Sequence, residues 1–277
     1  NEGIDWLELI YIGGAGSDFL QNNATGISGL NYDGGIGANA LENNANGLSN
    51  IVITGNVGDD IFANDGNNVA GIDFNGMDGR NTFINTGNYV SGVTFNGGSD
   101  ADRFINSGES LASAVFNAGA GDDWLILSGS DSQDIAMNGG DGDDVWFILS
   151  AETDNYGPFT FSSGDGDDIF VDRGRYTNNV TFDGGNGNDF LQLEGQWSYY
   201  FTFDGGEGND VLLHASGYAS NIEFNAGAGN DVFESRSDSG GYFTMYGGDG
   251  EDAYYQNVGS ADGIEFYGED GDDTLLN

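Results

Sequence analysis

The chain has 277 residues, of which 46 are acidic, five are arginine and none is lysine, so its formal net charge is −41. Nucleic acids and anionic membrane surfaces are bound by cationic patches, so this charge argues against both as partners. Cysteine is absent, which excludes disulfides and thiolate metal sites, and no apolar run of about 18 residues is present that could insert into a membrane.

An eleven-residue phrase recurs along the whole sequence. Its clearest form is Thr181-Phe-Asp-Gly-Gly-Asn-Gly-Asn-Asp-Phe-Leu191, and a close copy begins 21 residues later. A fixed period of this size predicts a solenoid, in which each repeat contacts only its neighbours. The spacing is 21 at every step but one, where three residues are added. The thirteen copies begin at Ile10, Asn31, Val52, Asp73, Thr94, Val115, Ala136, Thr160, Thr181, Thr202, Glu223, Thr244 and Glu265.

Three positions of the aligned repeats are apolar in every copy. They are the second residue of the phrase (Tyr11 to Phe266), the eleventh (Leu20 to Leu275) and the residue before the next copy (Leu30 to Ile264). The runs between them alternate like strands, and no segment has helical spacing. We therefore predict an all-β, right-handed parallel β-helix or β-roll solenoid of about thirteen rungs, with two or three short strands per rung and rungs about 4.8 Å apart. A single domain over residues 1–277 is expected, with partial rungs at 1–9 and 265–277 and full rungs over 10–264.

Two features interrupt or decorate the repeat. The first is a column of asparagines, which gives way to Leu127 and Ile148 in later copies; it consists of Asn22, Asn43, Asn64, Asn85 and Asn106. Stacked asparagines can form amide hydrogen-bond ladders, so a structural role is expected, with sugar or partner binding as the alternative. The second is the insertion at residues 152–158, which we expect to bulge outward as a longer loop.

The ninth position of the phrase is acidic in eleven copies and is asparagine at Asn39 and Asn81. Carboxylates on rungs about 4.8 Å apart would repel by about 3 kcal/mol per pair at an effective dielectric constant near 20. A divalent cation between turns would remove that repulsion, whereas the alternative is that these are solvated surface acids. Glycine permits tight turns that leave carbonyl oxygens uncovered, and carboxylate with carbonyl oxygens is the ligand set that calcium prefers. The aspartates are Asp18, Asp60, Asp102, Asp123, Asp144, Asp168, Asp189, Asp210, Asp231, Asp252 and Asp273.

The segments Gly140-Asp-Gly-Asp-Asp-Val-Trp146 and Gly185-Asn-Gly-Asn-Asp-Phe-Leu191 resemble the GGxGxDxUx nonapeptide of RTX, or haemolysin-type, calcium-binding β-rolls. The resemblance implies calcium, a parallel β-roll, and export from a bacterium to the cell surface or the extracellular medium. A typical β-roll turn contains two nonapeptides, whereas here one motif is followed by about twelve unmatched residues, so we expect a single calcium column along one edge. The turns at Asn39, Asn81 and 100–103 match least well. Besides the eleven aspartates, the candidate calcium ligands are Gly140, Gly142, Gly185, Gly187, Gly206, Gly208, Gly248 and Gly250.

The expected function is structural: a calcium-stiffened extracellular rod that assembles head to tail into a filament, matrix or surface layer. Leu275-Leu-Asn277 followed by Asn1-Glu-Gly-Ile4 resembles the internal segment Leu20 to Ile27, which favours stacking of subunits end to end. The alternative is a window cut from a longer protein, such as the stalk or ligand-binding segment of a secreted RTX adhesin.

The adhesin alternative places sugar contacts at Trp197, Tyr199 and Tyr200, and glycans could decorate Asn23 or Asn179.

An enzyme is not expected, because His214 is the only histidine and lysine and cysteine are absent. His214 is expected to be a packed or a surface residue. A calcium-dependent polysaccharide lyase or epimerase is less favoured, since only Arg173 and Arg175 share an obvious face.

Overall fold

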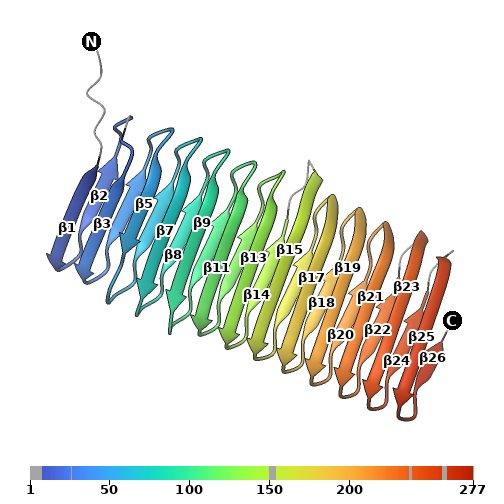
Figure 1. The fold of residues 1–277 in the computed structure, drawn as a ribbon. Helices are drawn as coiled ribbons and strands as arrows, with labels where there is room; N and C mark the ends of the chain where they lie inside the picture. Colours follow the sequence, from blue (N-terminus) through green and yellow to red (C-terminus); the bar gives the residue numbers. More distant parts are fainter. Residues whose placement is uncertain (1–7, 26, 150–153, 237–238, 258–260, 277) are drawn as a thin grey trace. The chain divides into compact units, whose positions relative to one another are not determined.

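The computed structural model describes residues 8–25, 27–149, 154–236, 239–257 and 261–276 (Figure 1). The fold is an all-β parallel solenoid of about 12 turns with about 21 residues per turn, and the described residues form no helix. The predicted fold class is confirmed. Accordingly, no helix in the described part of the chain is long and apolar enough to cross a membrane. The chain divides into two compact units, residues 1–139 and 140–277.

In residues 1–139, each turn contributes one strand to each of two parallel sheets, and neighbouring strands pair residues that lie 21 positions apart. The first sheet contains the longer strands β1 (Leu9–Ala15), β3 (Leu30–Ile36), β5 (Ser49–Thr54), β7 (Ala70–Met77), β9 (Ser91–Gly98), β11 (Ala112–Ala120) and β13 (Gln133–Asp141). The second contains β2 (Phe19–Asn22), β4 (Ala40–Asn43), β6 (Ile61–Asn64), β8 (Thr82–Asn85), β10 (Arg103–Asn106) and β12 (Trp124–Leu127).

In residues 140–277 the same two-strand turn recurs, with longer strands in the first sheet. These are β15 (Asp154–Asp165), β17 (Tyr176–Asn186), β19 (Trp197–Glu207), β21 (Tyr218–Ala228), β23 (Ser239–Asp249) and β25 (Ala261–Asp270). The second sheet contains β14 (Val145–Ile148), β16 (Ile169–Asp172), β18 (Phe190–Leu193), β20 (Val211–His214), β22 (Val232–Ser235), β24 (Ala253–Gln256) and β26 (Thr274–Leu276).

The three predicted apolar columns form the core between the two sheets of each unit. In residues 1–139, the Phe83 and Phe104 rings stack with centroids 4.8 Å apart, and Phe95 and Phe116 stack at 5.0 Å on the facing sheet. In residues 140–277, Phe203 and Phe224 stack at 4.7 Å. Aromatic pairs of this kind contribute about 0.5–1.5 kcal/mol each beyond the area they bury. The thin core is thus held together by contacts from turn to turn.

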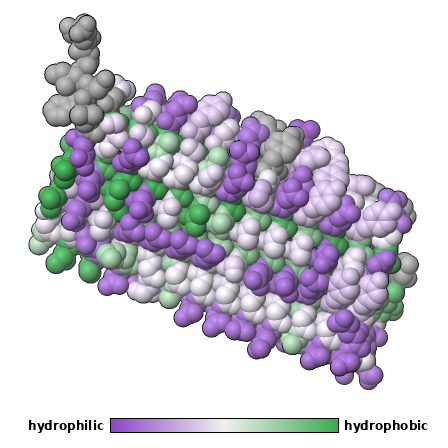
Figure 2. All heavy atoms as spheres, viewed as in Figure 1, coloured by the Kyte–Doolittle hydropathy of each residue, from purple (hydrophilic) through white to green (hydrophobic). Residues whose placement is uncertain are grey.

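Figure 2 shows hydrophilic side chains over much of one face, with apolar side chains visible near β1 and β3. Ile10, Ile12 and Ile36 of these strands are among the exposed apolar residues.

The insertion at 152–158 differs from its prediction. Residues 154–158 belong to β15 and extend it along β17, with a register irregularity between Tyr156 and Phe159. The predicted outward loop is therefore wrong for these residues, because backbone groups that pair with the neighbouring turn satisfy their hydrogen bonds within the sheet. Residues 150–153 lie outside the described part of the chain.

Candidate metal centre

The glycine-rich phrase forms the turn that leads from a long strand into the next short strand, as between β19 and β20. All eight glycines predicted as ligands have positive φ angles, between +93° and +147°: Gly140, Gly142, Gly185, Gly187, Gly206, Gly208, Gly248 and Gly250. This conformation is disfavoured for residues with a Cβ. In addition, a Cβ on Gly208 would collide with the carbonyl oxygen of Gly187 in the preceding turn. Glycine is required here both by the backbone conformation and by the close stacking of turns.

The aspartate column lies inside the turns. Asp18 and Asp273 are partly exposed, whereas the other nine predicted aspartates are buried: Asp60, Asp102, Asp123, Asp144, Asp168, Asp189, Asp210, Asp231 and Asp252. The alternative that they are solvated surface acids is therefore wrong for these nine. A buried carboxylate is costly unless it is hydrogen-bonded or paired with a cation, so the surroundings of each oxygen matter.

At most of these aspartates, one carboxylate oxygen ties its turn to the preceding one. Oδ1 of Asp210 accepts a hydrogen bond of 2.7 Å from the backbone N–H of Asp189, and Oδ1 of Asp231 accepts one of 2.6 Å from that of Asp210. In residues 1–139, Oδ1 of Asp102 accepts one of 2.5 Å from the N–H of Asn81. Charge-assisted bonds of this type are stronger than neutral ones. The column is therefore part of the scaffold.

The second carboxylate oxygen, Oδ2, has no hydrogen-bond partner at six of these described residues: Asp60, Asp102, Asp189, Asp210, Asp231 and Asp252. At five of them Oδ2 faces the first glycine of its own phrase, and at Asp231 the same position is Ala226. A Cβ on Gly184 would collide both with Oδ2 of Asp189 and with the carbonyl oxygen of Gly205 in the next turn. Two oxygens, one of them on a carboxylate, thus converge at a buried glycine where no donor lies between them.

Burial shifts the protonation of this column. Desolvation raises the pKa of Asp102, Asp189 and Asp231 to about 7, and that of Asp210 to about 6, although backbone hydrogen bonds to Oδ1 act in the opposite direction. The charged form is therefore held at a cost near neutral pH, which either a proton or a cation at Oδ2 would relieve.

Asn39 and Asn81 occupy the aspartate position of their turns without the cost of burying a charged carboxylate. Their Oδ1 atoms accept the N–H of Asp18 at 3.0 Å and of Asp60 at 3.2 Å, as the aspartates do. Their Nδ2 atoms donate to the carbonyl oxygens of Gly37 at 2.7 Å and Gly79 at 2.8 Å. The amide of Asn81 also reaches the carbonyl of Gly97 in the next turn at 3.4 Å. The side-chain amide thus supplies donors where an aspartate presents a bare oxygen.

The aspartate turns fit a hard cation in the chemistry of their donors. Those of Asp60, Asp102, Asp189, Asp210 and Asp252 each offer a carboxylate oxygen without a hydrogen-bond partner and a nearby backbone carbonyl oxygen, and calcium prefers six to eight oxygen ligands. Across the described residues, no three side chains of His, Cys, Asp or Glu gather into a metal-binding group. Most ligands would therefore have to be backbone carbonyls and water, with Asp Oδ2 supplying the charge. The ion would balance the negative charge of the buried carboxylate.

The candidate ligands predicted from the sequence are the second and third glycines of the phrase, and the position of the first glycine was missed. The structure places that position against Oδ2, as at Gly55, Gly97, Gly184, Gly205 and Gly247. A sequence signal was present, because this position is Gly, Ala or Ser in every copy. At Ser163, the hydroxyl donates to the carbonyl oxygen of Gly184 at 2.8 Å. Only a small side chain can lie between the aspartate and the next turn.

The predicted asparagine ladder is confirmed. Nδ2 of Asn22, Asn43, Asn64 and Asn85 each donates to Oδ1 of the asparagine in the next turn at 2.7–2.8 Å. All five members of the column are buried, so they form no surface for a sugar.

His214 occupies the same strand position in residues 140–277. It is buried, its Nδ1 lies 2.9 Å from Oγ of Ser235 and its Nε2 lies 2.5 Å from Oγ of Ser216. Desolvation lowers the pKa of His214 to about 4. Of the two expectations for this residue, packed rather than surface is correct.

Comparison of the chain with protein-family models, with curated proteins and with solved structures found no match. The parallel solenoid with a turn of about 21 residues is compatible with a β-roll repeat.

Proposed function

We propose that this protein is an extracellular calcium-binding structural solenoid of the RTX type, with a mechanical rather than a catalytic role. The observation that carries the proposal is a set of buried aspartates whose Oδ2 atoms lack a hydrogen-bond partner and lie beside a glycine and a carbonyl oxygen, namely Asp60, Asp102, Asp189, Asp210 and Asp252. The sequence resemblance to the RTX nonapeptide supports calcium as the ion, and the all-oxygen donor set agrees with that choice.

Calcium binding and folding are coupled in this proposal. The turns do not exist in the unfolded chain, so the binding free energy contributes to folding. One site at a free calcium concentration 100 times its Kd adds about 2.7 kcal/mol. Several sites filled at millimolar extracellular calcium stabilise the thin core strongly. In calcium-poor cytosol, the net charge of −41 and the unfilled column lower the stability of the folded chain, which favours its export in an unfolded state.

The test combines calcium titration with thermal unfolding. We expect isothermal titration to give several calcium ions per chain, and the melting temperature to rise steeply with calcium and fall on chelation. Magnesium is the control ion, because it demands near-octahedral geometry and keeps its waters, so it should stabilise much less. A protein that binds no calcium and melts at the same temperature in chelator would contradict the proposal.

Head-to-tail association into a filament, matrix or surface layer is the second part of the proposal. The residues that suggested it include 1–7 and Asn277, which lie outside the described part of the chain. Electron microscopy in calcium and after chelation tests it. Calcium-dependent filaments support assembly, whereas separate particles in calcium favour the alternative of an RTX adhesin segment.

A further inference from the structure

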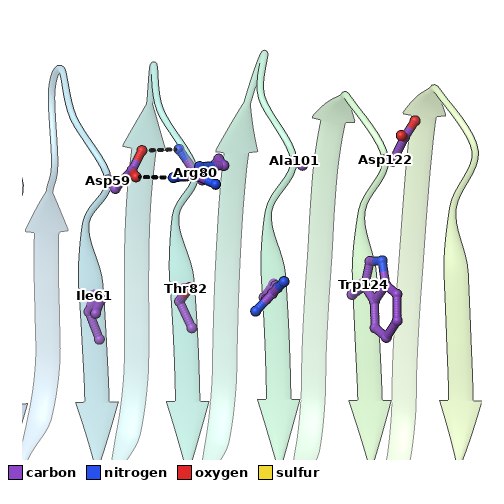
Figure 3. Close-up of a pocket in the computed structure, with 8 residues that line it drawn as sticks. Asp59, Ile61, Arg80, Thr82, Ala101, Asp122 and Trp124 are labelled. Carbon is purple, nitrogen blue, oxygen red and sulfur yellow. Dashed lines mark hydrogen bonds and ion pairs between the residues drawn. The ribbon is translucent and has the colours of Figure 1, made fainter.

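A shallow hollow of about 440 Å³ lies on the outer face of β6, β8, β10 and β12, within residues 59–124. Its lining residues form two rows (Figure 3). The first row comes from the residues two positions before each of the four strands, and the second from the first residues of those strands. The small side chain of Ala101 leaves the hollow open between Arg80 and Asp122 in the first row. Thr82, Arg103 and Trp124 line it in the second row.

The two arginines of this hollow have different surroundings. Arg80 is held by Asp59, with Nη2 2.8 Å from Oδ2 and its backbone N–H bonded to Oδ1 at 3.0 Å. Arg103 is exposed, and no carboxylate among the described residues lies within ion-pair distance of its guanidinium. On a chain with 46 acidic residues, an exposed arginine without an ion pair is unexpected. Its fork of donors is therefore available to an external anion.

Trp124 extends the hollow with an aromatic surface. It pairs in register with Arg103 on the neighbouring strand and is 41% exposed. A guanidinium binds a carboxylate through two parallel hydrogen bonds, and an indole face packs against apolar surface. The Thr82 hydroxyl adds a partner for a sugar hydroxyl group. A sugar ring with a carboxylate substituent presents all of these groups together.

The same combination recurs within residues 140–277. There Arg173 is ion-paired with Glu194, and Arg175 lies 5.7 Å from the ring centroid of Trp197. Arg175 donates to Oε1 of Gln196 at 3.3 Å and, like Arg103, has no carboxylate within ion-pair distance in the described part of the chain. A hollow of about 600 Å³ lies over Arg173, Arg175 and Glu194. Four of the five arginines thus lie in two hollows, each with one ion-paired arginine and one arginine near a tryptophan.

We propose that these two hollows bind the carboxylate-bearing sugar residues of short acidic oligosaccharides, whose few charges are repelled less by the net charge of −41 than those of a nucleic acid or a membrane surface. Arg103 and Arg175 bind the carboxylate, Trp124 contacts the apolar face of the ring in the first hollow, and the ion-paired arginines fix the rim. This role is separate from calcium binding and does not depend on it.

The test measures binding of short galacturonate oligomers to the whole chain, at fixed calcium, by isothermal titration. Maltose oligomers of equal length are the neutral control and poly-glutamate is the non-sugar anion. We expect galacturonate to bind in a salt-sensitive manner and both controls to bind at least tenfold more weakly. Equal binding of maltose oligomers or of poly-glutamate, or no binding of galacturonate, would overturn the proposal.

Variants locate the site. Arg103→Gln should remove one of two binding events, and Arg103→Gln with Arg175→Gln should lower the affinity at least tenfold. Arg236→Gln is the matched control, because that arginine is exposed and ion-paired with Glu234. Unchanged binding by the double variant would reject these hollows. Calcium titration of the same variants should match the wild type, so a failure of sugar binding is distinguishable from a failure of calcium binding.

Discussion

Asn81 and Asp102 occupy equivalent positions in consecutive turns, but their side chains make different hydrogen bonds. Both use Oδ1 to accept a backbone N–H from the preceding turn, at 3.2 Å for Asn81 and 2.5 Å for Asp102. Nδ2 of Asn81 then donates to the carbonyl of Gly79 at 2.8 Å. Oδ2 of Asp102 has no hydrogen-bond partner and lies against Gly97.

The difference shows what an aspartate turn needs. The two side chains have nearly the same shape. The amide carries its own N–H donors, which bond the nearby carbonyl oxygens, whereas a carboxylate can approach those oxygens favourably only with a bound proton or cation. A buried polar atom without a partner costs about 1–3 kcal/mol, and more if it is charged. Asparagine turns should therefore be stable under all conditions, whereas aspartate turns should respond to pH and to calcium.

The largest expected effect is the pH dependence of the calcium-free protein, because several buried carboxyls act together. Their folded-state pKa values are raised to about 6–7, above the usual value of 3.8, so the unfolded chain loses its protons first. Stability should therefore fall as pH rises from about 4 to about 7 and level off above that.

Urea unfolding in chelator at pH 5–8 measures this dependence, starting above the isoelectric point of about 4.1 to avoid precipitation. Saturating calcium should flatten the curve, since the ion favours the charged form. A calcium-free stability that stays constant or rises across this range would contradict the role assigned to the aspartate column.

The core could be predicted from the sequence because its signal is repeated. Phe74, Phe95 and Phe116 share one position of the repeat, and all three are buried. The asparagine ladder was predictable for the same reason, since identical residues 21 positions apart must stack in a solenoid with that period.

The burial of the aspartates was not predictable in the same way. Aspartate is ordinarily exposed, and its direction here depends on the positive φ angles of the glycines before it, which composition alone does not specify. The role of the first glycine was missed because its neighbour Oδ2 comes from five positions later, as with Gly184 and Asp189. The path of residues 154–158 depends on pairing with β17, which a loop-length argument does not consider.

Glycine substitutions test whether the two kinds of turn share one scaffold. Gly208→Ala, in the turn of Asp210, forces a Cβ into a left-handed backbone and against the carbonyl of Gly187. Gly79→Ala, in the turn of Asn81, meets the carbonyl of Gly58 in the same way. Each should cost about 3 kcal/mol in urea unfolding.

Gly47→Ala is the control, because Gly47 has a φ of +73° but no atom within 4 Å of an added Cβ. It should cost about 1 kcal/mol from backbone strain alone. Similar losses for Gly208→Ala and Gly79→Ala would show that aspartate and asparagine turns share one backbone and differ only in the Asp or Asn side chain. A much smaller loss at either one would mean that their stacking differs.

Asp102→Asn converts an aspartate turn into an asparagine turn. At pH 7.5 in chelator it should stabilise the protein by about 2 kcal/mol, because the new Nδ2 donates where Oδ2 had no partner. Calcium titration should give one ion fewer. Asp183→Asn, at an exposed position, controls for the change in net charge and should alter neither quantity appreciably. Destabilisation by Asp102→Asn in chelator would contradict the interpretation of Oδ2.

Asn81→Asp makes the reverse change and should have the smallest effect. In chelator at pH 7.5 it places a carboxylate oxygen opposite the carbonyls of Gly79 and Gly97, so about 1 kcal/mol should be lost. Calcium should restore the lost stability and fill one additional site. If the loss persists in saturating calcium, the aspartate alone does not create a cation site, and the backbone of each aspartate turn must differ from that of the asparagine turns.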